Sequence, residues 1–152
     1  MPFDANLVLA DTTLDWDKTN IDLYGEPVAT SRNSGGFAVV DLLALSGTSA
    51  QGMAVILVVT GSVTTADELT LTVESSDQLD FVSDSTNDVR TLATFDILGK
   101  ALGIIEGSEC PCTVVRRIVT TQRYIRAHAE VSAGDDYGAC WVLLAPWPFN
   151  TI

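Results

Sequence analysis

Short apolar segments separated by turn-forming residues run along the whole chain. In residues 69–75, leucine and valine alternate with threonine and glutamate, which is the period of two expected of a strand with one buried face. The other segments are rich in Val, Ile and Thr and are bounded by Gly, Asp, Asn or Ser, the residues that favour turns. The pattern therefore predicts about eight strands, over residues 20–23, 37–45, 53–60, 69–75, 91–98, 112–121, 123–131 and 139–145.

No segment of the chain shows the apolar spacing of a good amphipathic helix. Residues 98–105 offer one possible turn, which Gly99 and Gly103 weaken. Many short strands without helices indicate an all-β fold, an antiparallel β-sandwich of jelly-roll type. The 152 residues suit one domain, and no repeat or linker divides them. We therefore expect a single domain over residues 1–152, with an extended N-terminal arm over 1–18 and a C-terminal tail over 146–152.

The predicted strand over residues 123–131 holds the single histidine of the chain. Alternation gives this strand a polar face, made of Tyr124, Arg126, His128 and Glu130. Its other face is apolar and should meet the core, through Ile125, Ala127, Ala129 and Val131. His128 could serve as a general base, but the chain has no G-x-S-x-G motif and no second histidine. We interpret His128 as a structural residue and expect no enzymatic activity.

The net charge of −12 argues against binding to nucleic acid or to an anionic membrane, because both need an excess of Lys and Arg. Beyond residue 101 the basic residues are all arginines: Arg116, Arg117, Arg123 and Arg126. We expect the predicted strands over residues 112–121 and 123–131 to pair as a hairpin. This pairing would gather the four arginines into a basic patch. Two interpretations stay open. The arginines pair with the chain's own acids, such as Glu130, or they face acids on a partner.

Residue spacing indicates no metal or cofactor site. Structural zinc takes four ligands, usually with C-x-x-C spacing, whereas the chain has C-P-C over residues 110–112 and one further cysteine, Cys140. The acidic loop over residues 77–88 does not match the spacing of a calcium-binding EF-hand, so we expect a solvated loop. The N-terminus carries acids where a signal peptide needs bases, and the longest apolar run is too short to span a membrane. We expect a soluble protein made in the cytoplasm.

Aromatic residues near the two ends suggest contacts with another protein. Trp16 lies in D-W-D and Trp147 in P-W-P-F, and we expect both to be less committed to the core than Trp141. The tail also carries Phe149 and Ile152, and its prolines keep it out of a central strand. The segment ACWVLLA is apolar on both faces, so it is either a central strand or a strand covered by another subunit.

Taken in order, these segments resemble the small jelly-roll cement, or decoration, proteins of tailed-bacteriophage capsids. The matching pieces are an arm followed by TNIDL, then LTLTVESSDQLDF, TLATFDIL and RYIRAHAEV, and lastly a glycine turn before CWVLLA. They span nearly the whole chain. The connection GKALGIIEGSECPC and the tail PWPFNTI depart from the family's pattern.

The resemblance implies a protein without catalytic residues or cofactors that binds the outer surface of an assembled capsid and cements neighbouring subunits of the major capsid protein. Such a protein would be made in the bacterial host cytoplasm and end in the virion, as a homo-oligomer such as a dimer or trimer. We expect its contacts to come from the following residues: Trp16, Trp147, Phe149, Ile152, Arg116, Arg117, Arg123 and Arg126. The alternative is a carbohydrate-binding β-sandwich that uses Trp16 or Trp147 as a platform, and a jelly-roll enzyme is a third option.

Overall fold

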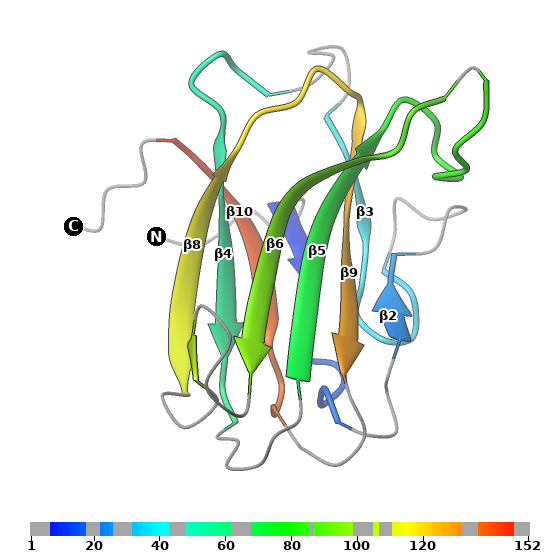
Figure 1. Cartoon of the computed structure of the whole chain (residues 1–152). Coiled ribbons are helices and arrows are strands. Elements are labelled where there is room, and N and C mark those ends of the chain that lie inside the picture. Colours follow the sequence, from blue (N-terminus) through cyan, green and yellow to red (C-terminus); the bar gives the residue numbers. More distant parts are fainter. Residues whose placement is uncertain are drawn as a thin grey trace.

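The computed structural model of the chain describes residues 7–17, 22–25, 32–42, 48–61, 68–85, 87–98, 105–106, 111–131 and 137–147. Figure 1 shows two sheets packed face to face. The described residues form ten strands: β1 (Val8–Ala10), β2 (Asp22–Tyr24), β3 (Val39–Asp41), β4 (Met53–Val59), β5 (Glu68–Ser76), β6 (Arg90–Leu98), β7 (Ile105–Glu106), β8 (Cys112–Ile118), β9 (Tyr124–Val131) and β10 (Trp141–Pro146). The expected all-β sandwich is confirmed. No helix within these ranges is long and apolar enough to cross a membrane.

The first sheet has four antiparallel strands in the order β1-β10-β4-β8, and the second has the order β2-β9-β5-β6-β7. Strands β2 and β3 share one edge of β9, where β3 pairs with the stretch from Tyr124 to Arg126 and β2 with the stretch from His128 to Glu130. The short β7 lies parallel to β6. This topology places the polar face of β9 beside two short edge strands, and that face carries the site described below.

The core lies between the sheets, and the predicted alternation places side chains there correctly. Strand β9 turns its apolar face inward, as expected, and these residues are at most 3% exposed: Ile125, Ala127, Ala129 and Val131. Strand β5 contributes Leu69, Leu71 and Val73, all fully buried. A strand with a period of two buries every second side chain, so both assignments follow from the sequence pattern.

The N-terminal region differs from the expected arm. Residues 8–10 form β1, which pairs with β10 inside the first sheet. Trp16 is fully buried rather than exposed, and its ring stacks on Phe37 with centroids 5.5 Å apart. Its backbone N–H donates to Gly138 O (2.9 Å), and Tyr137 N–H donates to its carbonyl (3.0 Å). The arm assignment is therefore corrected for residues 7–17, and Trp16 is a core residue.

The expected hairpin between β8 and β9 is wrong. Strand β8 pairs with β4 in the first sheet and β9 with β5 in the second, so the chain crosses one end of the sandwich between them (Figure 1). A buried polar network holds this crossing: Thr120 Oγ1 lies 3.1 Å from Ser75 Oγ, which lies 2.6 Å from Gln122 Oε1. Because buried polar groups need such partners, the network fixes the crossing where a turn was expected.

Candidate functional site

The outer face of the second sheet carries a cluster of paired charges around β9. Arg126 Nε donates to Glu74 Oε2 at 2.8 Å, and both side chains are less than a fifth exposed. The Arg126 guanidinium also lies over the rings of Tyr24 (5.3 Å) and Phe81 (4.4 Å). Phe81 has φ 51°, an uncommon left-handed conformation for a residue of its size. The loop after β5 thus places an aromatic ring against the arginine and shields the ion pair from water.

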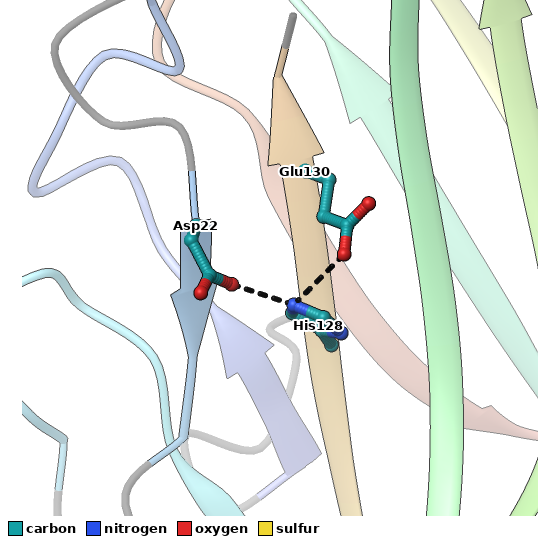
Figure 2. Close-up of side chains that lie close together, drawn as sticks. All are labelled: Asp22, His128 and Glu130. Atoms are coloured by element: carbon teal, nitrogen blue, oxygen red, sulfur yellow. Dashed lines mark hydrogen bonds and ion pairs between the residues drawn. The ribbon is translucent and has the colours of Figure 1, made fainter.

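Two residues further along β9, His128 lies between two carboxylates (Figure 2). Its Nε2 is 2.7 Å from Asp22 Oδ1 and 3.7 Å from Glu130 Oε1. Asp22 stands directly opposite Glu130 in the register of β2 and β9, and Tyr24 stands opposite His128. The Tyr24 ring meets the imidazole edge-on, with centroids 5.6 Å apart. The imidazole is one quarter exposed, while each carboxylate is more than half exposed.

Sequence reasoning did not find this cluster. It placed His128 and Glu130 on one face, which the structure bears out, and it offered Glu130 as one possible partner of the arginines. In the structure Arg126 pairs with Glu74 instead, and Glu130 approaches the histidine. Asp22 is 106 residues from His128, and only the register of β2 on β9 brings the two together. The available signal was the H-x-E spacing on a strand, which aims two ligand-type side chains the same way.

The expected basic patch does not form, because β8 and β9 belong to different sheets. Arg123 makes two hydrogen bonds to Asp41, at 2.9 and 2.8 Å, and this bonding raises the pKa of its guanidinium above the ordinary value. Arg117 donates to Gln51 O at 2.8 Å, while Arg116 lies 5.7 Å from the centre of the Phe95 ring. Internal pairing is thus found for Arg123 and Arg126, with acids other than the expected Glu130.

The first sheet has a second apolar cluster on its outer face. The segment ACWVLLA was expected to be either a central strand or a strand covered by another subunit, and its strand β10 is central. Its alternate side chains Val142 and Leu144 enter the core. The side chains facing away from the core form a separate buried cluster of Val8, Ala54, Ile56, Leu143 and Ala145. Half-buried Val58 and Trp141 pack against it. Val115, opposite Ile56 in the register, is 36% exposed. We call Val58, Val115 and Trp141 the outer patch.

Trp147 follows β10 and is 37% exposed. It borders an open groove of about 350 Å³ whose apolar lining includes Leu7, Leu42 and Met53. The other tail residues expected to make contacts, Phe149 and Ile152, lie outside the described residues. Pro146, expected in a tail kept out of any central strand, instead ends β10 and pairs with Met53. Trp147 is the described residue beyond β10, and it is placed for contact with another molecule.

The other chemical candidates are the cysteines and the acidic loop. Cys140 is buried, and Cys112 lies half-buried at the start of β8. The acidic loop is organised by buried Asn87, whose Nδ2 donates to Val82 O at 2.6 Å and whose backbone N–H donates to Asp84 Oδ1 at 2.9 Å. In the part of the loop that the structure describes, no three carboxylates gather within ligand distance of one another.

No known protein family, curated protein or solved structure matches this chain.

Proposed function

We propose that this chain is a capsid decoration protein of a tailed bacteriophage, which acts by binding rather than by catalysis. It would attach to the outer surface of an assembled shell as a homo-oligomer and cement neighbouring subunits of the major capsid protein. Support comes from the order of the strand segments, which resembles that of the family, and from the β-sandwich fold. The protein would be made in the host cytoplasm and carried on the virion.

The observation that carries the proposal is that the two central strands of the first sheet, β4 and β10, are apolar on both faces. Antiparallel sheets of a sandwich usually turn a polar face to water, whereas here the outward residues of β4 and β10 are apolar throughout. At the margin of this cluster the outer patch offers valine and tryptophan to solvent. Accessible apolar side chains gathered on one sheet are typical of a surface that meets another protein.

The mechanism is preferential binding to the assembled state. A ligand that binds the closed shell and not free coat subunits stabilises the shell, by an amount that rises with the logarithm of its concentration over Kd. If an oligomer spans several coat subunits, the first contact raises the effective concentration of the next. Modest individual contacts then suffice. The net charge of −12 would also keep decorated particles apart by mutual repulsion.

The test compares two valine substitutions in cosedimentation with DNA-free shells of the phage that encodes the chain. Val115→Glu places a charge in the outer patch, and we expect it to weaken shell binding at least about tenfold, because the charge would be desolvated in the interface. Val82→Glu is the control, since Val82 is 53% exposed in the loop after β5. It should bind within about twofold of wild type. Equal binding by both variants would contradict this use of the first sheet.

The carbohydrate-binding alternative loses one of its two platforms, since Trp16 is fully buried and cannot stack on a sugar. Trp147 remains accessible to such a ligand. A glycan array separates the two functions: binding to a defined sugar that Trp147→Ala abolishes would favour the alternative, while shell binding without glycan binding favours decoration.

A further inference from the structure

We infer that Asp22, His128 and Glu130 form a binding site for a divalent transition-metal cation of the zinc class. The three ligand atoms lie within 4.8 Å of one another, and they come from two neighbouring strands, β2 and β9 (Figure 2). The inference is independent of capsid binding, because it rests on this cluster alone.

The first reason is the charge arrangement at the sheet edge. Asp22 and Glu130 stand directly opposite each other in the register, and like charges at such positions destabilise strand pairing. Arg126, on the same face of β9, is already engaged by Glu74 at 2.8 Å. A divalent ion between the two carboxylates would neutralise both and convert their repulsion into attraction.

The second reason is the spacing of the ligand atoms. Zinc binds imidazole nitrogen and carboxylate oxygen at about 2.0–2.2 Å, so two ligands at a tetrahedral angle are roughly 3.3–3.5 Å apart. The distances from His128 Nε2 to the Asp22 and Glu130 oxygens, 2.7 and 3.7 Å, lie on either side of that value. Both carboxylates are more than half exposed, so small side-chain rotations can bring them to coordination distance.

The third reason is the choice of donors. One imidazole with two carboxylates suits zinc and its neighbours in the first transition series, whereas calcium and magnesium take oxygen ligands. Three protein ligands leave a fourth position for water. The edge-on Tyr24 ring packs against the imidazole and helps to hold its orientation. A bound ion would tie the three-residue strand β2 to β9.

The competing explanation is a plain ion pair between His128 and Asp22, with Glu130 as a bystander. It predicts that Glu130 contributes nothing to metal affinity. Because the chain has a single histidine, the imidazole signals in a ¹H–¹⁵N spectrum report on His128 alone. This gives a direct readout that distinguishes the cluster from any thiol that captures zinc.

The experiment titrates ZnCl₂ into the full chain carrying Cys110→Ser/Cys112→Ser, at about pH 7.5 so that the imidazole can bind metal. Calorimetry and the imidazole spectrum are followed together. We expect one zinc per chain, a saturable shift of the His128 signals and a higher unfolding temperature. Asp22→Asn and Glu130→Gln should each weaken binding at least about tenfold. Asp80→Asn, an exposed acid in the loop after β5, should bind within about twofold of the parent.

The inference is overturned if zinc up to about 1 mM leaves the imidazole signals unchanged, since that bounds the affinity below any useful value. It is also overturned if Glu130→Gln binds zinc as tightly as the parent, which would leave a histidine–aspartate pair only. Both carboxylates are exposed, so neither substitution should unfold the chain.

Discussion

Replacing Trp16 with alanine should lower the free energy of unfolding by about 3 kcal/mol. The side chain is fully buried and stacks on Phe37, and truncating a buried tryptophan usually costs about 3–5 kcal/mol. The expected value lies at the low end, because the indole Nε1 has no hydrogen-bond partner among the described residues and its removal relieves that penalty. For a chain of this length the melting temperature should fall by about 6–12 °C.

Urea unfolding followed by far-UV circular dichroism measures this change, with Trp147→Ala as the matched control. Trp147 is 37% exposed, so its truncation should alter stability by less than about 1 kcal/mol. The slope of the transition should stay the same in all three proteins, which would show that the compactness of their unfolded states is unchanged. If Trp16→Ala were as stable as wild type, Trp16 would be a surface residue and the corrected N-terminal packing would be wrong.

Three further predictions concern charges. Val131→Asp should unfold the domain, because Val131 is 3% exposed and an unpaired charge there is costly. A variant that keeps the circular dichroism spectrum of the folded protein would show that the faces of β9 are reversed. Arg126→Gln should cost about 1–3 kcal/mol in urea unfolding, since it leaves a shielded carboxylate unpaired, whereas Arg90→Gln at an exposed pair should cost no more than about 0.5. The double variant Arg116→Gln/Arg123→Gln should bind shells with the same dependence of affinity on NaCl concentration as wild type, because these arginines make internal contacts. A shallower dependence in the variant would assign the two arginines to the coat interface.

The strands and their buried faces could be predicted because each depends on local alternation. All eight expected strand regions contain a strand, and β5 and β9 bury the expected residues. Strand β1 was missed because three apolar residues carry no recognisable period, and Trp16 was misplaced because the aspartates on either side suggested an exposed loop. Its burial depends on a long-range contact with Tyr137 and Gly138 that no local pattern records.

The pairing of strands could not be predicted to the same degree. Neighbouring strands usually pair, which favoured a hairpin of β8 and β9, but the buried network of Ser75, Thr120 and Gln122 joins the chain to the other sheet at that point. The same limitation hid the cluster around His128. Its members could be recognised as ligand types, yet only the register of β2 on β9 places Asp22 beside the histidine.

The proposed capsid function is tested most directly by electron cryomicroscopy of DNA-free shells mixed with the purified chain. Shells from the encoding phage, stripped of any surface protein, are imaged with and without the chain in molar excess over coat subunits. Decoration predicts added density on the outer surface, at repeated icosahedral positions, into which the two-sheet sandwich fits with its first sheet or Trp147 toward the coat. Shells that stay bare at saturating concentrations of a folded chain would contradict the proposal.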